Sequence, residues 1–298
     1  MENIAEIQEV KNIGAKEKLA AFYELTKPRI AFMLVLTAAA GFYIGSDAGF
    51  NWMLFANTII GITLLAFGVA TLNQVIERNL DGLMERTEKR PLPSGRLSTM
   101  EALIFGSLLC VTSEIYIAFL VNGLTAILGL VVIVGYVFLY TPLKTKTSAS
   151  TAIGALPGAL PPLMGFTAAA DSITLGAWAM FTILFLWQFP HFLAIAWMYR
   201  EDYRKAGILM LPVLEEDGKI TASQIVLFTV LLIPVSLAPF FLGIAGWVYL
   251  IGAILLGIWF LYASIQAARY KSIPQARKLM LVSVLYLPVI FALLVFNH

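Results

Sequence analysis

Oxygen-bearing side chains recur every four residues at the end of a long apolar run. Asn73, Glu77 and Asp81 follow residues 48–72, which carry no charge. On a helix, each step of four residues rises about 6 Å and turns about 40°, so the three side chains would form one stripe. Carboxylate and amide oxygens are hard ligands, which Mg²⁺ accepts while it shares its remaining positions with phosphate groups. The spacing therefore predicts a magnesium site for a substrate with phosphate groups.

Basic side chains on the same segment could bind phosphate oxygens directly. They are Arg78, Arg86, Lys89, Arg90 and Arg96. A guanidinium group can donate two parallel hydrogen bonds to one phosphate. A metal-bridged diphosphate needs both acidic and basic side chains. If the segment served only membrane topology, the acidic residues would offset the charge of the basic ones. The alternative is a solvated charged loop with Asn73 as a helix cap or packing amide, because an N-x3-E-x3-D pattern is weak in isolation.

Two further polar patches follow other apolar runs. One contains Asp202 and Arg204, and the other, YTPLKTKT at residues 140–147, contains Lys144 and Lys146. Polar patches at the ends of different helices can enclose one polar site when these ends lie on the same face of a membrane. We therefore expect these patches to converge on the first stripe.

The elements that position the patches are predicted from composition. Hydrophobic residues make up 60% of the 298 residues and charged residues 13%, against about 45–50% and about 25% in soluble domains. A bilayer core of about 30 Å takes about 20 apolar residues per helix, and only helices satisfy their own backbone in lipid at this hydrophobicity. Asn122-Gly123 and Gly243–Gly246 divide the longest runs. The chain is thus predicted to be an all-α integral membrane protein with nine transmembrane helices, near 29–46, 52–76, 102–120, 124–141, 149–169, 174–199, 222–242, 246–267 and 279–296.

Lysine and arginine lie on one side of the nine predicted spans. All twenty are found in the N-terminal tail and in the segments 77–101, 142–148, 200–221 and 268–278. The positive-inside rule therefore predicts a cytoplasmic N-terminus and a C-terminus outside. The acidic first 25 residues are unlike a signal or transit peptide, which favours the bacterial plasma (inner) membrane.

The chain is predicted to have one domain and a short tail. Residues 1–24 would form a cytoplasmic tail with an interfacial helix, and residues 25–298 a single transmembrane domain in the lipid bilayer. The net charge of +2 gives no signature of nucleic-acid binding, so no nucleic-acid partner is expected. The lone Cys110 excludes an intramolecular disulfide and is expected to serve packing.

Several motifs resemble those of a known family. The stretch 73–95 has the pattern N-x3-E-x3-D-x2-M-x-R-T-x2-R-P-x-P-x-G. It is similar to the first signature of the UbiA prenyltransferase superfamily, and in detail to its protohaem farnesyltransferase branch, the haem O synthases. YTPLK with GALPGALPPLMG, WQFPHF with EDYRKAG, and LTKPRI resemble other motifs of that branch, so the resemblance extends over residues 25–212. Two departures are Glu77, where many members have Asp, and Thr145, where a basic residue is common.

The resemblance implies a UbiA-type bundle and a prenyl transfer reaction. Members of the branch transfer the farnesyl group of farnesyl diphosphate to a vinyl group of protohaem IX (haem B), with addition of water, to give haem O and diphosphate. The implied magnesium ligands are Asn73, Glu77 and Asp81, with a second ion at Asp202. The residues implied to bind substrate are Arg86, Arg90, Lys144, Lys146, Arg204, Tyr140, His191 and Trp187. A downstream haem-modifying enzyme or an oxidase assembly factor is an expected partner.

His191 is the predicted residue of the haem side. An imidazole within a membrane span is uncommon and suggests a function, and neutral imidazole is a usual axial ligand of haem iron. On a continuous helix His191 would lie within about 20° of the face of Asp202 and about 16 Å from it. Trp187, one turn earlier, could stack on the porphyrin. The alternatives are an imidazole bonded to a carbonyl of a neighbouring helix and a tryptophan that only packs.

Two other functions are compatible with parts of the sequence. One is a UbiA-type prenyltransferase that acts on an aromatic quinone precursor, which would not require His191. The other is a transporter or structural subunit, which would place charges along a path through the membrane. Among Asp, Glu, Lys, Arg and His, only Glu114 and His191 lie in the interior of the predicted spans. We expect Glu114 to bond a polar group of an adjoining helix, and Pro157, Pro161 and Pro162 to break or kink the fifth span.

Overall fold

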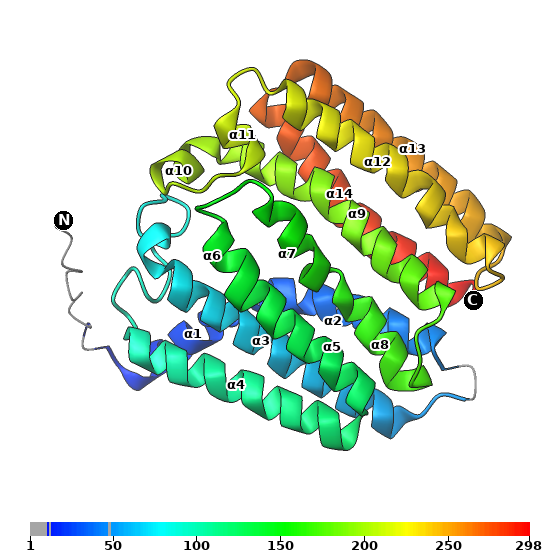
Figure 1. Ribbon diagram of the computed structural model, residues 1–298, viewed down its shortest axis with the longest axis horizontal. Coiled ribbons are helices and arrows are strands. Elements are labelled where there is room, and N and C mark those ends of the chain that lie inside the picture. The colour runs from blue at the N-terminus through cyan, green and yellow to red at the C-terminus, as the bar shows by residue number, and fades with distance from the viewer. Residues whose placement is uncertain (1–10, 12, 47–48) are drawn as a thin grey trace.

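The computed structural model describes residues 11, 13–46 and 49–298, and this part of the chain contains helices and loops but no strand (Figure 1). Within these residues eight helices are long and apolar enough to cross a membrane, or nine if a bent pair of helices counts as one span. The all-α class and the prediction of nine spans are therefore confirmed. Within the predicted tail, residues 1–10 and 12 lie outside the described residues, as does Asp47.

The helices follow the predicted spans with clear differences in length. The unbroken helices are α2 (Pro28–Ile44), α3 (Trp52–Asp81), α4 (Thr99–Leu120), α9 (Leu175–Met198), α12 (Lys219–Phe241), α13 (Trp247–Tyr270) and α14 (Ile273–Phe296). The other elements are α1 (Ala15–Leu25), α5 (Gly123–Ile133), the π-helix η1 (Val134–Tyr140), α6 (Thr141–Leu143), α7 (Ser150–Gly158), α8 (Leu160–Ala170), α10 (Arg200–Lys205) and α11 (Leu211–Leu214). Helix α3 continues about one turn beyond its predicted span, so the whole stripe from Asn73 to Asp81 is helical.

Local sequence explains where the helices begin and break. Ser98 and Glu101 form a reciprocal capping box at the start of α4, and the side chain of Asn122 caps α5, which confirms the predicted division at this residue. The fifth span breaks at Ala159, one residue before Leu160-Pro161-Pro162 begins α8. This break confirms the effect predicted for the prolines, because proline cannot donate to the preceding turn.

The helices form two groups that meet along α2, α8 and α14. Helices α9, α12, α13 and α14 pack against one another, as do α2, α3, α4, α5 and α8. Helices α2 and α8 approach so closely that a Cβ atom on Gly165 would collide with the backbone carbonyl of Ala38, and one on Gly41 with that of Pro162. Small residues allow such contacts between helices in a membrane.

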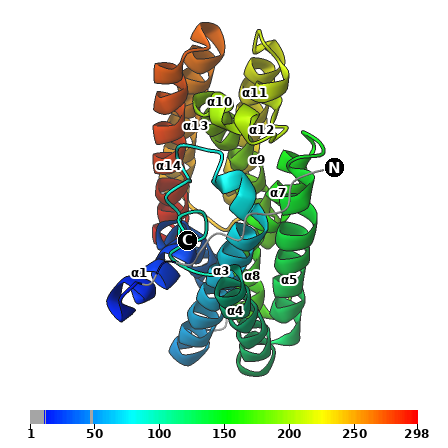
Figure 2. The ribbon, with the colours of Figure 1, turned by 90° about the vertical axis from the view of Figure 1, so that its left-hand side faces the viewer.

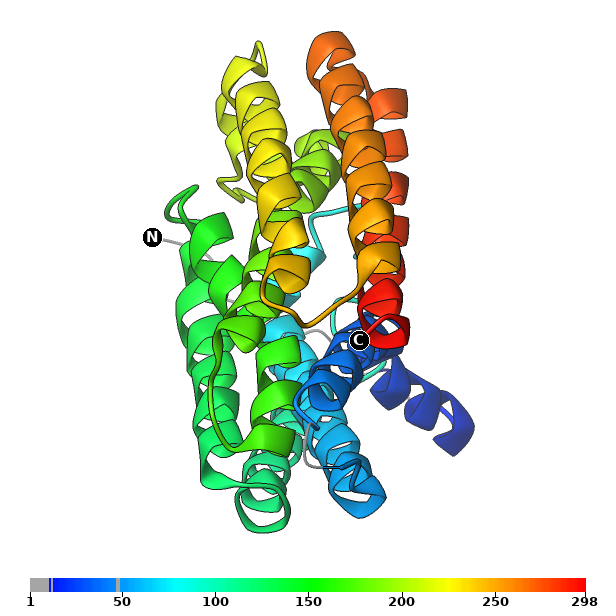
Figure 3. The same ribbon diagram turned by 90° about the vertical axis from the view of Figure 1, so that its right-hand side faces the viewer.

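The two ends of the bundle differ in chemistry. The loop between α3 and α4, the segment from α6 to α7, and α10 with α11 gather at the end that faces the viewer in Figure 2. We call this end, with residues 77–101, 142–148, 200–221 and 268–278, the charged end. The loops 171–174 and 242–246 and the C-terminus lie at the opposite end, shown in Figure 3. Helix α1 packs at the charged end, where Leu25 joins Val75 and Leu92 in a small apolar cluster.

Candidate active site

The stripe of oxygen-bearing side chains is buried within the protein. Asn73, Glu77 and Asp81 retain only 1%, 6% and 1% of their exposure. They lie on α3 at intervals of four residues, so their side chains follow one another along a single face. The interpretation of these residues as a solvated loop is therefore wrong, because a buried carboxylate needs compensating partners.

Each member of the stripe meets a cation from a different segment. Lys27 Nζ donates to Asn73 Oδ1 at 2.9 Å. Lys144 Nζ pairs with Glu77 Oε1. Arg90 donates to both carboxylate oxygens of Asp81, at 2.7 and 2.8 Å. The predicted ligands of an ion and the predicted phosphate contacts are thus interleaved in one ladder of charges.

The three cations come from segments that the fold brings to one place. Lys27 lies at the bend between α1 and α2 with a left-handed backbone (φ 49°), which costs about 1 kcal/mol or more for a residue other than glycine. Lys144 follows α6, and Arg90 lies in the loop after α3. Burial alone would lower the pKa of Lys144, but the neighbouring Glu77 carboxylate raises it well above its ordinary value. The ammonium group of Lys144 is therefore a permanent positive charge at neutral pH.

The π-helix η1 brings a fourth polar group to the stripe. The N–H and the hydroxyl of Thr141 both bond the carbonyl of Tyr136, the hydroxyl at 2.8 Å. The same hydroxyl accepts a hydrogen bond from Asn73 Nδ2 at 3.1 Å. This bond fixes the amide of Asn73 so that its carbonyl oxygen faces Lys27. Pro142 follows directly and has no N–H to continue the regular α-helical pattern.

Aromatic rings lie beside the ladder of charges. Lys144 Nζ is 4.4 Å from the centre of the Tyr140 ring, and the rings of Tyr136 and Tyr140 meet edge to face at 4.9 Å. A cation at this distance from an aromatic face is attracted by the ring quadrupole. The predicted residue Tyr140 thus lies next to a predicted phosphate contact.

The second charged patch meets the first through the loop that follows α3. The guanidinium of Arg86 lies 5.0 Å from the centre of the Tyr199 ring and 3.5 Å from the hydroxyl of Tyr203. The backbone N–H of Leu209 donates to the carbonyl of Lys144 at 2.7 Å. Contacts therefore join all three segments, as the sequence predicted.

Three predicted residues lie outside this network. Asp202 is half-buried and forms no side-chain hydrogen bond or ion pair in the described part of the chain. Lys146 is exposed. Arg204 is paired with Glu201 at 2.6 Å, and about half of its side chain is exposed. The structure does not connect these three side chains to the stripe on α3.

The donor set on α3 fits a magnesium ion that is shared with a phosphorylated ligand. Among the described residues, no three His, Cys, Asp or Glu side chains lie close enough to hold one ion together. Mg²⁺ needs only one or two carboxylates when substrate phosphates and water complete its octahedron. Glu77 and Asp81 supply two carboxylates, and Asn73 adds an amide oxygen on the same face.

His191 and Trp187 lie on α9 and contact α14. Trp187 Nε1 donates to the backbone carbonyl of Ser283 at 2.7 Å, and His191 Nδ1 lies 2.7 Å from its hydroxyl. The two rings stack at 4.6 Å with 17° between their planes. The prediction that His191 and Asp202 share one continuous helical face is wrong, since α9 ends at Met198 and Tyr199 leaves the helical conformation before α10.

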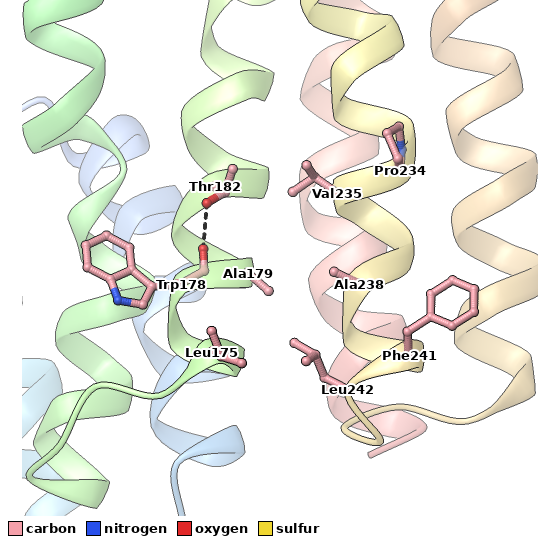
Figure 4. A pocket seen from close by; sticks show the side chains of 9 residues that line it. All are labelled: Leu175, Trp178, Ala179, Thr182, Pro234, Val235, Ala238, Phe241 and Leu242. Carbon is pink, nitrogen blue, oxygen red and sulfur yellow. Dashed lines mark hydrogen bonds between the residues drawn. The ribbon is translucent and has the colours of Figure 1, made fainter.

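An apolar groove of about 500 Å³ lies between α9 and α12 at the opposite end of the bundle (Figure 4). Its lining is almost entirely hydrophobic, and the hydroxyl of Thr182 is engaged by the carbonyl of Trp178. The groove contains none of the predicted site residues. It offers space for an acyl chain and no group that could carry a reaction.

Some residues of the site could not be recognised from the sequence. Thr141 and Ser283 are common polar residues in or next to apolar helices, and no spacing distinguishes them. Lys27 lies in the motif LTKPRI, and the structure directs its amine to Asn73. The bend imposed by Pro28 was the one available signal, because the residue before a proline avoids the α-helical region.

This arrangement of apolar helices with a buried acidic and basic ladder defines a class of membrane protein. Residues 34–291 match the UbiA prenyltransferase family, and the chain belongs to that family. The fold agrees with solved structures. Digeranylgeranylglyceryl phosphate synthase superposes with a TM-score of 0.79 at 19% identity, covering 94% of this chain and 98% of that chain. A UbiA homologue from Archaeoglobus fulgidus, bound to GPP and Mg²⁺, gives 0.68 at 18% identity, covering 92% and 99%.

Two relatives with higher sequence identity narrow the comparison. The protoheme IX farnesyltransferase of Solibacter usitatus is 47% identical over 286 residues, which cover 93% of this chain and 98% of that protein. The protoheme IX farnesyltransferase of Salinibacter ruber is 45% identical and covers 91% of this chain and 95% of its own length. The sequence similarity therefore extends over nearly the whole length of this chain and of each relative.

Proposed function

We propose that this chain transfers the farnesyl group of farnesyl diphosphate to a vinyl group of haem B, with addition of water, to give haem O and diphosphate. The observation that carries the proposal is the buried ladder of Asn73, Glu77 and Asp81 with Lys27, Lys144 and Arg90. Relatives named for this activity at 45–47% identity support the choice of substrates.

The ladder has the chemistry to bind a diphosphate and to help it leave. Three basic side chains face two carboxylates and an amide, so the set is neutral or carries at most one excess positive charge, according to the protonation of the buried Lys27. When the diphosphate enters, Lys27, Lys144 and Arg90 can turn from their present partners to phosphate oxygens. These charges then stabilise the negative charge that develops as the allylic carbon–oxygen bond breaks.

The acidic side of the ladder would hold Mg²⁺ together with the diphosphate. Its ligands would be Asn73, Glu77 and Asp81, with Asp202 proposed for a second ion. Bound Mg²⁺ supplies Lewis acidity toward the leaving oxygens. Arg86, Lys146 and Arg204 would attract the diphosphate to the charged end, where opposite charges raise the local concentration of a ligand.

The allylic cation needs a dry, electron-rich surrounding until it meets the vinyl group. The rings of Tyr136 and Tyr140 lie directly beside Lys144, which would bind the departing diphosphate. Aromatic faces attract a cation by about 2 kcal/mol or more when water is excluded. These two rings would therefore protect the cation from premature attack by water.

The haem side of the site is assigned to α9. His191 would face the haem and supply an axial ligand to its iron, and neutral imidazole suits that role. Trp187 would support the ring of His191 by stacking. The chain would lie in a bacterial plasma membrane with its N-terminus and charged end in the cytoplasm and its C-terminus outside. A haem-modifying enzyme or oxidase assembly factor would receive the product.

Two parallel incubations, one with haem B and one with a hydroxybenzoate acceptor, test the proposal. Purified protein with haem B, farnesyl diphosphate and Mg²⁺ should yield a porphyrin heavier by one farnesyl group and one hydroxyl group, detected by mass spectrometry, while the other proton of the added water is released. Prenylation of a hydroxybenzoate acceptor and not of haem would favour a quinone-type prenyltransferase. No product from either acceptor would exclude prenyl transfer under these conditions and favour a transporter.

Asp81→Ala should abolish transfer, and the protein should still insert and fold, although with lower stability because Arg90 loses its buried partner. The change removes two carboxylate oxygens that the proposed metal site needs and leaves Arg90 without its partner. Product formation and gel-filtration behaviour should be compared with Glu85→Ala, an exposed acid on the following turn. Near-normal turnover in Asp81→Ala would remove this residue from the metal site.

A further inference from the structure

A polar cluster joins α9 to α14 within the bundle. The side chains of His191 and Trp187 both form hydrogen bonds with Ser283. His191 bonds its hydroxyl, and Trp187 donates to its backbone carbonyl. Ser283 is completely buried. Stacking of the indole on the imidazole fixes the plane of the ring, and the bond to Ser283 fixes its rotation. The imidazole thus has one defined orientation.

The hydroxyl of Ser283 has only one proton, and that proton has a partner. Ser283 Oγ donates to the backbone carbonyl of Met280 at 2.6 Å. The same oxygen can therefore only accept a hydrogen bond from His191 Nδ1, which lies 2.7 Å away. The hydrogen bonds require a proton on Nδ1 of His191.

The position of this proton decides the state of the other ring nitrogen. A neutral imidazole has one ring proton, so Nε2 of His191 carries an unshared electron pair. Nε2 forms no hydrogen bond in the described part of the chain. The two carboxylate oxygens of Glu114, by contrast, are fully buried and have no hydrogen-bond partner. His191 Nε2 is thus an acceptor without a partner among the described residues, on a side chain that is half-buried.

We propose that Ser283 is a positioning residue that holds His191 as its Nδ1–H tautomer, so that Nε2 is available to bind the iron of haem. The inference rests on the proposed haem substrate. Ser283 touches no reacting atom and acts through the imidazole alone. Its carbonyl anchors Trp187, so one residue of α14 orders both aromatic side chains of α9.

The hydrogen bond also strengthens the ligand. An imidazole that donates the N–H of one ring nitrogen to an oxygen is a stronger base at the other ring nitrogen. Loss of such a hydrogen-bond partner commonly lowers metal affinity about 10–100-fold. Because a serine hydroxyl is an uncharged acceptor, we expect the smaller of these effects. Ser283→Ala should weaken haem binding about tenfold.

The first experiment measures the tautomer without haem and without turnover. The chain has only two histidines, His191 and His298, so protein labelled with ¹⁵N-histidine gives two sets of ring signals, and His298→Gln assigns them. His191 should show a protonated Nδ1 and an unprotonated Nε2. Ser283→Ala should give a mixture of tautomers, and Ser283→Thr should restore the original state. Protonation of His191 at Nε2 in the unaltered protein would overturn the proposal.

The second experiment measures the consequence for the iron. Resonance Raman spectra of the protein with ferrous haem B should contain an iron–histidine stretching band that His191→Ala removes. Ser283→Ala should shift this band to lower wavenumber and raise the Kd for haem. The matched control is Ser236→Ala, which deletes another fully buried hydroxyl that bonds α14, through Tyr286. This control should leave the band and the Kd unchanged.

The outcomes separate this inference from the proposed function. If haem O forms but Ser283→Ala leaves both the tautomer and the iron–histidine band unchanged, the role of Ser283 is wrong while farnesyl transfer stands. If the tautomer is as described but no haem O forms, the failure lies in the proposed function. A band shift of equal size in Ser236→Ala would also overturn the role of Ser283, since it would report a general loosening of α14.

Discussion

The residues best suited to carry out chemistry in this protein form two buried ion pairs. Each pair joins an acid of α3 to a base of another segment. Glu77 pairs with Lys144, and Asp81 with Arg90. Such pairs contribute little net stability, because the cost of desolvation offsets the attraction between the charges. Removal of one partner alone is expensive, however, since it leaves a buried charge uncompensated. The pairs are therefore suited to exchange partners when a charged ligand arrives.

The pair of Glu77 and Lys144 can be tested by separating stability from activity. Lys144→Met should lower stability by about 3–5 kcal/mol, because Glu77 would remain buried without a counter-charge. The double variant Glu77→Gln with Lys144→Met should recover most of this loss, since a neutral pair of similar volume is tolerated. Both variants should lack transferase activity. Thermal unfolding in detergent and product assays provide the two measurements.

A lack of recovery in the double variant would show that Lys144 stabilises the protein through contacts other than its charge. Its packing against Tyr140 is the obvious contact of this kind. Recovery of activity together with stability would contradict the assignment of both residues to the diphosphate site.

Glu114 presents the opposite case. Both of its carboxylate oxygens are buried without a hydrogen-bond partner, so the predicted bond to an adjoining helix does not form. The side chain lies against Gly129 of α5. Because an unpaired buried polar group only costs free energy, Glu114→Gln or Glu114→Met should retain full transferase activity and an equal or higher Tm. A marked loss of activity would reveal a function for this acid that its contacts do not indicate.

At the scale of the elements, the sequence predicted long regular helices better than their interruptions. The nine spans follow from hydropathy. The helix start at Asn122 and the break near Ala159 follow from the chemistry of Asn and Pro. The π-helix from Val134 to Tyr140 does not follow from either, because hydropathy does not encode the bonds that the N–H and hydroxyl of Thr141 make to the carbonyl of Tyr136. A π-turn shifts the following residues around the helix axis, and here those residues contact the stripe on α3. Such turns occur frequently at functional sites.

The close contact of α2 with α8 is an element-scale feature with a direct test. Gly165→Ala adds one methyl group that would collide with the backbone carbonyl of Ala38. Since neither backbone can yield without moving a helix, we expect a loss of about 1–3 kcal/mol. The matched control is Gly123→Ala at the start of α5, where a Cβ meets nothing within 4 Å. Thermal unfolding of the two variants should differ clearly, and equal Tm values would show that the helices can separate without penalty.

At the scale of the whole molecule, the convergence of three charged segments could be predicted only in outline. The confinement of Lys and Arg to alternate loops placed these segments at one end, which is a consequence of topology. Which cation meets which acid depends on long-range packing, and the sequence did not predict that Lys27 would reach Asn73. The discontinuity at Tyr199 likewise separated Asp202 from the axis of His191; the sequence placed the end of a span near residue 199 but did not show that the helix itself stops there.

The predicted orientation of the whole bundle can be measured with single cysteines. Cys110 is buried and is the one cysteine in the chain, so Cys110→Ala supplies a background for labelling. Glu216→Cys lies at the charged end, and Ser172→Cys and His298→Cys lie at the other, all at exposed positions. If the charged end is cytoplasmic, a membrane-impermeant maleimide should label residues 172 and 298 in spheroplasts, and residue 216 only after the membrane is opened. The reverse pattern would place the diphosphate site outside the cell, away from a soluble diphosphate substrate, and would contradict the proposed reaction. Labelling of 172 and 298 from opposite sides would contradict the even number of spans that separates them.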